Sequence, residues 1–185
     1  MLIYKNTNTN YIFIHIPKNS GKYIRNKIFN DNNNEIVKSY WDIYSNLDLA
    51  HIPYIKKDEF IENNIEYNYF TYTRYPYDRI ISGFFYKNPD KNIDDFQNFV
   101  KNTLILYDFS MNFNCDIIHY YPQYLFVCDE NLNIPKNITI SKLENLENPR
   151  KYNLSEYFDS NCINIINNIY IKDFLFFDYQ MINGI

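Results

Sequence analysis

The first clear pattern in the chain is a short apolar run, followed by polar residues and then by helical periodicity. Residues 11–16 (YIFIHI) are β-branched or aromatic, which predicts a buried strand. Pro17 has no amide hydrogen to donate to a strand ladder, so the strand should end there. Residues 18–21 (KNSG) form a polar turn, and from Lys22 onward apolar residues recur at helical spacing. The pattern therefore predicts a strand, a turn and a helix in direct succession.

Further along the chain, the apolar period switches repeatedly between that of strands and that of helices. Strands are predicted at residues 35–40, 68–73 and 138–141, and helical segments at residues 57–62, 76–86, 93–106, 161–170 and 172–179. Residues 41–49 fit neither period, and residues 107–116 are typical of a loop. Strands that alternate with helices indicate an α/β fold with a central parallel sheet flanked by helices. Because no linker or internal repeat divides the chain, we expect residues 1–185 to form one domain.

Composition narrows the classes of protein and of partner. The chain has 185 residues, of which 46% are hydrophobic and 19% aromatic, so we expect a folded core and not disorder. Its net charge of −4 implies no general attraction to nucleic acid, so an anion site would need a local basic patch. The cysteines at positions 115, 128 and 162 fit neither a metal motif nor a disulfide framework. With no signal peptide and no apolar run of ~18 residues, the sequence predicts a cytoplasmic protein without membrane contact.

The turn at residues 18–21 has the chemistry of an anion site. Backbone N–H groups at the start of a helix and the positive end of its dipole both favour phosphate, and Lys18 adds a full charge. It is not a Walker A loop, because Ile16 stands where that motif needs glycine and Tyr23 where it needs serine or threonine. Many crossover units share this strand–turn–helix pattern and bind no phosphate. The pattern alone therefore leaves both interpretations open.

A second polar cluster follows the strand predicted at residues 68–73. Arg74 lies at the strand end, Pro76 suits the first turn of a helix, and Ser82 is placed to face back toward the strand. A guanidinium fork and a hydroxyl together suit a terminal phosphate. By spacing alone, however, a surface arginine and an ordinary helix serine are the simpler interpretation.

Together, the two clusters resemble the nucleotide-binding motifs of sulfotransferases that use 3′-phosphoadenosine 5′-phosphosulfate (PAPS). The first, IHIPKNSG, is similar to the 5′-phosphosulfate loop of that family, and the matching residues are His15, Pro17, Lys18 and Gly21. The second, RYPYDRIIS, is similar to its 3′-phosphate motif, and the matching residues are Arg74, Pro76, Arg79 and Ser82. Two such motifs in the right order are more specific than either alone. The resemblance implies a P-loop-like three-layer fold.

The resemblance also implies which residues hold the cofactor. These are Lys18, Asn19, Ser20, Gly21, Lys22 and Tyr23 at the 5′ end, with Arg74 and Ser82 at the 3′-phosphate. Arg79 would have a structural or secondary role. The first loop departs from the family, because Lys22 and Tyr23 replace two hydroxyl donors to the 5′-phosphate. Asn19 and Lys22 could still donate hydrogen bonds to an anion.

The stretch AHIPYI at residues 50–55 lies between the two motifs. It resembles a segment of heparan sulfate and uronyl 2-O-sulfotransferases in which a histidine is the proposed general base. The resemblance implies that His51 takes this role, and histidine has a pKa suited to it, although a lone histidine is more often structural. His119 is the competing candidate, whereas His15 is expected to point away from the cleft.

Weaker resemblances cover more of the chain. HYYPQYLF at residues 119–126 is similar to a segment near the family's acceptor cleft, which implies that His119 and Gln123 contact the substrate. Arg150 and Lys151 fall where relatives place a basic loop over the 3′-phosphate. Residues 138–146 and 170–179 resemble the family's penultimate strand and terminal helix.

These observations predict a PAPS-dependent sulfotransferase of the carbohydrate type that needs no metal. Lys18 would neutralise charge on the leaving 5′-phosphate, and His51 would remove the proton of the acceptor hydroxyl. A glycan is the favoured acceptor, although protein tyrosine and small phenols or alcohols present the same group. One alternative is a nucleotide kinase, which the missing Walker A pattern and the lack of a clear Mg²⁺-binding aspartate disfavour. The other is a catalytically inactive module that keeps the fold and binds nucleotide, as the altered loop would suit.

Overall fold

A computed structural model describes residues 1–62, 64–146 and 152–183 of the chain. The strands are β1 (Leu2–Asn6), β2 (Thr9–Phe13), β3 (Asn34–Ser39), β4 (Ile43–Tyr44), β5 (Leu47–Asp48), β6 (Asn68–Thr73) and β7 (Ile138–Lys142). The α-helices are α1 (Gly21–Phe29), α2 (Pro76–Lys87), α3 (Ile93–Asn102), α4 (Leu154–Tyr157), α5 (Ser160–Ile169) and α6 (Ile171–Phe176). Short 3₁₀ turns are η1 (Leu49–His51), η2 (Tyr54–Glu59), η3 (Leu104–Leu106), η4 (Ile118–Tyr120), η5 (Gln123–Phe126) and η6 (Leu143–Asn145).

The main sheet has five strands in the order β3-β1-β2-β6-β7. The pairs β2–β6 and β6–β7 are parallel, but β1 runs antiparallel to both of its neighbours. The expectation of a parallel sheet is therefore correct for β2, β6 and β7 and wrong for the sheet as a whole. The cause is a hairpin in which Asn6 pairs with Thr9 across a two-residue loop, with Thr7 at φ 55. Threonine is an unusual residue for positive φ, so the sequence carries no strong hairpin signal there.

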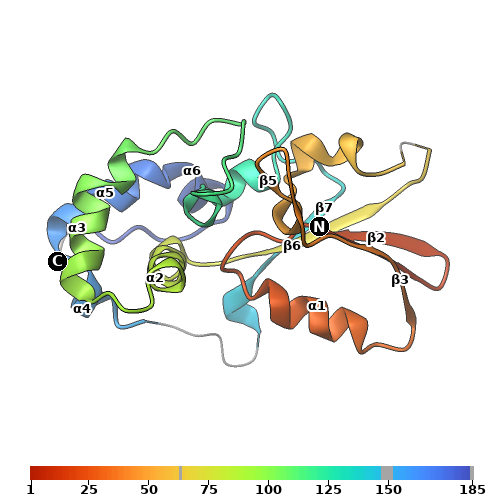
Figure 1. Cartoon of the computed structure of the whole chain (residues 1–185), viewed down its shortest axis with the longest axis horizontal. Helices are drawn as coiled ribbons and strands as arrows, with labels where there is room; N and C mark the ends of the chain where they lie inside the picture. Colours follow the sequence, from red (N-terminus) through yellow and green to blue (C-terminus); the bar gives the residue numbers. More distant parts are fainter. Residues whose placement is uncertain (63, 147–151, 184–185) are drawn as a thin grey trace.

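Apolar side chains alternate between the two faces of this sheet, as strand geometry requires. Phe13 packs with Ile24 and Ile28 of α1 on one face, whereas Ile12 joins a larger core cluster on the other. Figure 1 shows α1 on one side of the sheet and the helical segment of residues 54–59 on the other. The mixed α/β class is thus confirmed. Short 3₁₀ turns and loops, however, supply much of the second covering layer.

The remaining α-helices form a cluster of their own. In Figure 1, α2, α3, α4 and α5 lie together at the opposite end of the molecule from β2 and β3. The core that these helices share with α6 contains Tyr77, Phe96, Ile163 and Phe174, all of which are buried. The helix predicted from Pro76 is confirmed, with proline in its first turn. The helix predicted at residues 93–106 ends earlier as an α-helix, at Asn102, and its last turn is the 3₁₀ turn η3.

The segment at residues 41–49, which fitted neither period, forms the small β4–β5 hairpin. Its turn residues Ser45 and Asn46 both have positive φ, at 48° and 63°, which is the backbone of a type I′ hairpin turn. This hairpin leads into η1 and His51. Within the described ranges, none of the helices combines the length and the apolar character that a membrane crossing requires.

Candidate functional site

A cleft of about 360 Å³ lies where the parallel strands β2 and β6 end. It brings together most of the residues predicted from the two motifs, together with all three histidines of the chain. The residues that line it are His15, Lys18, Ser20, Gly21, Lys22, Trp41, His51, Arg74, Ser82, Tyr86 and His119. Because parallel strands end at the same edge of a sheet, loops distant in sequence meet here.

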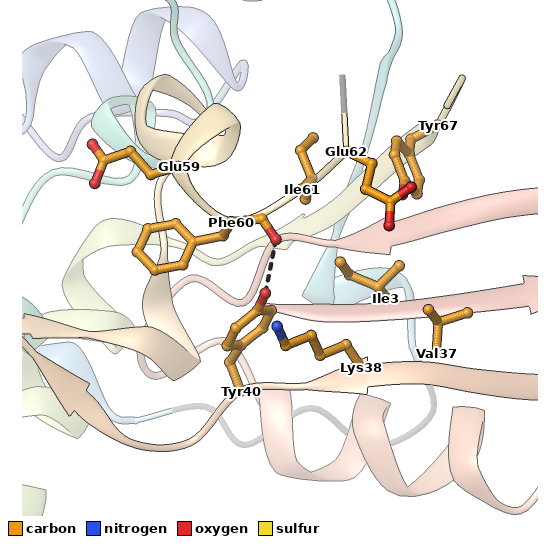
Figure 2. A pocket seen from close by; sticks show the side chains of 9 residues that line it. All are labelled: Ile3, Val37, Lys38, Tyr40, Glu59, Phe60, Ile61, Glu62 and Tyr67. Carbon is orange, nitrogen blue, oxygen red and sulfur yellow. Dashed lines mark hydrogen bonds between the residues drawn. The ribbon is translucent and has the colours of Figure 1, made fainter. Parts of the chain in front are cut away.

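A cavity of the same volume lies elsewhere, between β3 and the segment of residues 59–62 (Figure 2). Figure 2 shows the Tyr40 hydroxyl donating to the carbonyl of Phe60, at 2.8 Å, on its wall. None of the residues predicted for the site lines this cavity. This cavity therefore contributes none of the predicted site residues.

The turn after β2 has non-glycine residues in the left-handed backbone region. Lys18 and Ser20 have φ values of 68° and 56°, in the left-handed region, and α1 begins directly after Ser20. Gly21 is required by space, because a Cβ atom there would lie 1.7 Å from Nε2 of His15. The close approach lets the amino end of α1 and the ring of His15 share one wall of the cleft. This is the end of a helix that favours an anion.

Asn19 does not line the cleft, although it belongs to the turn. Its side chain is buried and donates to the carbonyl of Tyr72, at 2.6 Å, and to Oε1 of Gln123, at 2.8 Å. Gln123 in turn accepts from the amide of Arg74 at 2.9 Å and donates to its carbonyl at 2.8 Å. Gln123 is 0% exposed, so it joins the two loops instead of contacting substrate as predicted. The backbone amides of Gln123 and Tyr124 are held by the buried carboxylate of Asp173.

Two arginines tie α2 and its preceding loop to the turn after β2. Arg74 donates to the carbonyl of Lys18 at 3.2 Å, and its guanidinium lies 5.8 Å from the ring centroid of Tyr152. Arg79 is buried and donates to the carbonyls of Pro17, at 3.2 Å, and Tyr121, at 2.5 Å. Arg79 therefore has the structural position that the sequence suggested, whereas Arg74 lies on the cleft wall.

Tyr86 joins two parts of the site. The Lys18 ammonium lies 3.7 Å from the centroid of the Tyr86 ring. The centroid of the His119 ring lies 5.0 Å from the same point, and the two ring planes are tilted relative to each other. Tyr86 also lines a neighbouring cavity of about 420 Å³, which shares Lys18 and Ser82 with the cleft. The other residues of that cavity are Phe85, Pro89, Tyr152 and Tyr157. The cationic and polar wall of the cleft is thus continuous with the aromatic wall of the neighbouring cavity.

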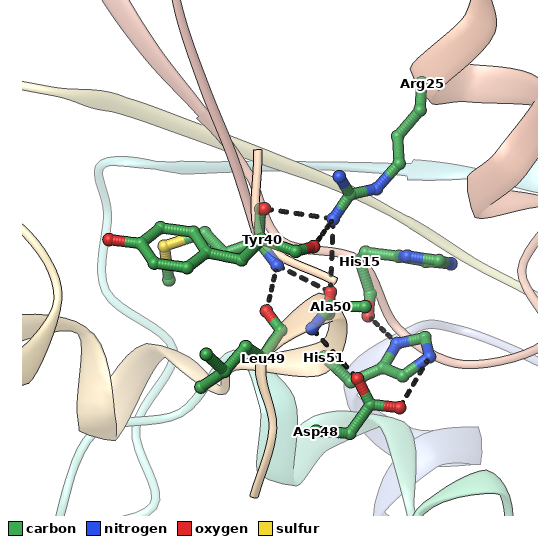
Figure 3. Close-up of polar contacts among 8 residues, drawn as sticks. His15, Arg25, Tyr40, Asp48, Leu49, Ala50 and His51 are labelled. Carbon is green, nitrogen blue, oxygen red and sulfur yellow. Dashed lines mark hydrogen bonds and ion pairs between the residues drawn. The ribbon is translucent and has the colours of Figure 1, made fainter. Parts of the chain in front are cut away.

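His51 is held in one tautomer by its surroundings. Its Nδ1 lies 2.7 Å from the backbone carbonyl of His15, and a carbonyl can only accept, so Nδ1 carries the hydrogen. Nε2 then has a lone pair and lies 3.8 Å from Oδ2 of Asp48, as Figure 3 shows. Burial lowers the pKa of His51 well below its usual value, against the opposing effect of the hydrogen bond to His15. At neutral pH the ring is a neutral proton acceptor.

The two other histidines are also neutral. His15 was expected to point away from the cleft, and that expectation is wrong: its ring lines the cleft, 4.3 Å from the ring of His51. Burial lowers the pKa of His15 well below its usual value, with the charge of nearby groups adding to the effect. Burial and then the charges of Lys87, Lys18 and Arg79 lower the pKa of His119 to about 3. No group of three or more His, Cys, Asp or Glu in the described ranges is arranged to hold a metal ion.

Some of the predicted residues lie elsewhere, and some cleft residues escaped prediction. The Tyr23 side chain is 44% exposed and does not line the cleft. Arg150 and Lys151 lie outside the described residues. Trp41 and Tyr86 were not predicted, because Trp41 falls in the segment with no clear period and Tyr86 in the last turn of a helix. The chain's single tryptophan, set between the two motifs, was the available clue.

Comparisons of the chain with models of known families, with curated proteins and with solved structures find no match.

Proposed function

We propose that the chain binds PAPS in this cleft and transfers its sulfuryl group to a hydroxyl acceptor. One observation carries the proposal: the two sequence clusters and all three histidines line a single cleft. Lys18 and Arg74 come from loops more than 50 residues apart, yet Arg74 donates to the carbonyl of Lys18. A chance match of two short motifs would not be expected to place both at the ends of adjacent parallel strands.

In this proposal the cationic side of the cleft holds the nucleotide. Lys18 and the amide groups at the start of α1 bind the 5′-phosphosulfate, which matches the positive end of the helix dipole. Arg74 and Ser82 bind the 3′-phosphate, and the aromatic cavity beside them receives the rest of the nucleotide. Tyr23 has no part in this arrangement, since it lies outside the cleft.

The chemical step places the acceptor on the histidine side. The acceptor oxygen attacks sulfur, the bond from sulfur to the bridging phosphate oxygen breaks, and that oxygen keeps the electron pair. The acceptor proton goes to Nε2 of His51, whose lone pair is fixed by the hydrogen bond from Nδ1 to His15. Lys18 stabilises the charge that grows on the leaving phosphate. The products are a sulfate ester, adenosine 3′,5′-bisphosphate and one proton.

A second candidate is a module that binds the nucleotide without transferring sulfate. The observation that favours it is the loss of both hydroxyl donors at positions 22 and 23, where the chain has Lys22 in the cleft and Tyr23 outside it. Such a module would bind adenosine 3′,5′-bisphosphate as well as the enzyme does. Sulfate transfer from PAPS separates these two candidates.

The nucleotide site is tested by thermal unfolding with adenosine 3′,5′-bisphosphate and with AMP, which lacks the 3′-phosphate. A ligand of the native state raises the unfolding temperature, so the bisphosphate should stabilise and AMP should do so much less. Arg74→Ala should weaken bisphosphate binding by about 1.5–3 kcal/mol, the scale of a charge-assisted hydrogen bond. Arg74→Lys is the matched control, since it keeps the charge and loses the fork.

Equal stabilisation by AMP would contradict the roles of Arg74 and Ser82. Stabilisation by ATP with Mg²⁺ but not by the bisphosphate would instead favour a kinase. Each variant is first compared with the parent chain without ligand, so that a loss of folding is not taken for a loss of binding.

A further inference from the structure

Trp41 stands at the mouth of the cleft on the histidine side. Its side chain is 53% exposed, and it lines the cleft with His15 and His51. The guanidinium of Arg25 lies 4.3 Å from the indole ring, and the ring of His15 meets it edge-on at 6.4 Å. An exposed aromatic side chain supported in this way presents a flat apolar surface.

Arg25 holds this surface in place. It is buried and donates to the carbonyls of Tyr40 and Ala50, which precede and follow the β4–β5 hairpin (Figure 3). It also donates to the carbonyl of Met1 and to the hydroxyl of Ser39. The backbone next to Trp41 and the backbone next to His51 are thus fixed by one side chain. The distance from the aromatic surface to the proposed base is set before any ligand arrives, which is what positioning requires.

The charges on the two sides of the cleft differ. The cations that line it are Lys18, Lys22 and Arg74, from the turn after β2, the first turn of α1 and the end of β6, all assigned to the nucleotide. Asp48 lies on the other side, 3.8 Å from Nε2 of His51. Burial raises the pKa of Asp48, whereas the charges of Lys87 and the buried Arg25 act in the opposite direction, so this side of the cleft holds charges of both signs. Among the described residues that line the cleft, none offers a cation to a polyanionic acceptor beyond the nucleotide's own set.

We propose that the acceptor is a small, uncharged, ring-shaped hydroxyl compound that stacks on Trp41 while its hydroxyl reaches Nε2 of His51. The inference rests on the proposed function and narrows it. It departs from the resemblance to heparan sulfate enzymes, whose acceptors are polyanions. A cleft of about 360 Å³ that also receives the phosphosulfate leaves room for one or two rings. A phenol and a neutral sugar ring share the required chemistry, namely a flat apolar face with a hydroxyl at its edge.

The depressed basicity of His51 agrees with such an acceptor. Burial lowers the pKa of His51, so it is a weak base, and a weak base removes the proton of a phenol more readily than that of an alcohol. The lowered pKa of His51 therefore favours a phenol over a sugar as the acceptor. The test below separates the two.

Because Trp41 is the chain's single tryptophan, its fluorescence reports directly on the site. The full chain, with adenosine 3′,5′-bisphosphate present, is titrated with 4-methylphenol, with methyl β-glucoside and with a heparosan tetrasaccharide, which is a polyanion. Quenching that saturates with a neutral ring, and is absent or far weaker with the tetrasaccharide, supports the proposal. Saturable quenching by the tetrasaccharide alone, or by none of the three, overturns it.

Variants test the role of the ring. Trp41→Leu should raise KM for the neutral acceptor about 10-fold, the scale of one lost aromatic contact, and leave kcat within about 3-fold. Trp41→Phe should restore most of the affinity, and neither change should alter bisphosphate binding. Tyr44→Leu is the matched control, because Tyr44 is 65% exposed on the same hairpin and does not line the cleft. An unchanged KM in Trp41→Leu, or an equal rise in Tyr44→Leu, overturns the proposal.

Failure of this inference is distinguishable from failure of the proposed function. If the bisphosphate binds but only the polyanion quenches Trp41, the nucleotide site stands and the acceptor class is wrong. If the bisphosphate does not bind, the proposed function falls, and the same titrations without nucleotide then judge whether Trp41 binds a neutral ring.

Discussion

The two sides of the cleft differ in charge: one carries cationic side chains, and the other carries neutral histidine rings. On one side, the cationic side chains of Lys18 and Arg74 follow β2 and β6, where the start of α1 adds its positive dipole. On the other side, His15, His51 and His119 are buried deeply enough that each has a lowered pKa and stays neutral. After burial, the charges of Lys87, Lys18 and Arg79 add to this effect at His119. A cleft built this way can hold an anion and still keep a neutral base a short distance away.

Removal of the proposed base should have the largest effect on the cleft. His51→Ala should lower sulfate transfer by roughly 10²–10⁴-fold, the usual range for a general base, and leave bisphosphate binding intact. The measurement is transfer at saturating PAPS, with His119→Ala as the matched control from the same side of the cleft. Near-normal transfer by His51→Ala, together with loss in His119→Ala, would move the base to His119.

Removing the positive charge of Lys18 should have the next largest effect. Lys18→Ala should lower turnover by roughly 10²–10³-fold, because charge on the leaving phosphate would lose its nearest stabilising group. Nucleotide affinity should fall less than turnover. Lys22→Ala is the control, since Lys22 lines the same wall of the cleft. If Lys22→Ala were the more damaging change, the loop would be aligned wrongly with the family motif.

The two loops that carry the cations are joined by Gln123, which gives a third test. Gln123→Leu keeps the volume but leaves the backbone amide and carbonyl of Arg74 without this partner, and the side-chain amide of Asn19 keeps only its hydrogen bond to Tyr72. We expect the free energy of unfolding to fall by about 1–3 kcal/mol, the cost of unsatisfied buried groups, as measured by urea denaturation. Unchanged stability with a raised acceptor KM would restore the substrate-binding role that the sequence predicted.

The smallest expected effect is a dependence of stability on pH. A histidine whose pKa is lowered on folding binds fewer protons in the native state, so stability is full above the unfolded pKa of about 6.5 and falls as pH drops below it. Each of the three should cost about 1 kcal/mol one pH unit below that value. Asp173, whose pKa burial raises to about 6, acts in the opposite direction at lower pH.

This effect is measured as the free energy of unfolding at about pH 7.5 and about pH 5.5, where the histidines act together with the buried amino group of Met1, whose pKa burial also lowers. His119→Gln should reduce the difference between the two values, since it removes one of the three groups. A chain equally stable at both values would show that the histidine side is open to water and that its rings are not held neutral.

Local sequence determined much of what makes the site. Short local patterns predict three of its elements. Aromatic and β-branched residues predict the strand at residues 68–73, proline predicts the helix from Pro76, and a run of polar residues predicts the turn before α1. Lys18 and Arg74 could be predicted at the ends of parallel strands for the same reason. Those features depend on neighbours in sequence, so a linear pattern records them.

The tertiary structure alone decided the rest. The reversal of β1, the burial of Asn19 and Gln123, and the turn of His15 into the cleft all depend on partners distant along the chain. Gln123 meets Asn19 across 104 positions, and no periodicity within either segment marks that contact. The Trp41 ring lies beside the histidines because Arg25 contacts the ring and donates to the carbonyls of Tyr40 and Ala50 on either side of the hairpin. The positions of these side chains depend on hydrogen bonds between distant segments and on the space that packing leaves. A linear pattern of apolar and polar residues records neither the hydrogen bonds nor the space.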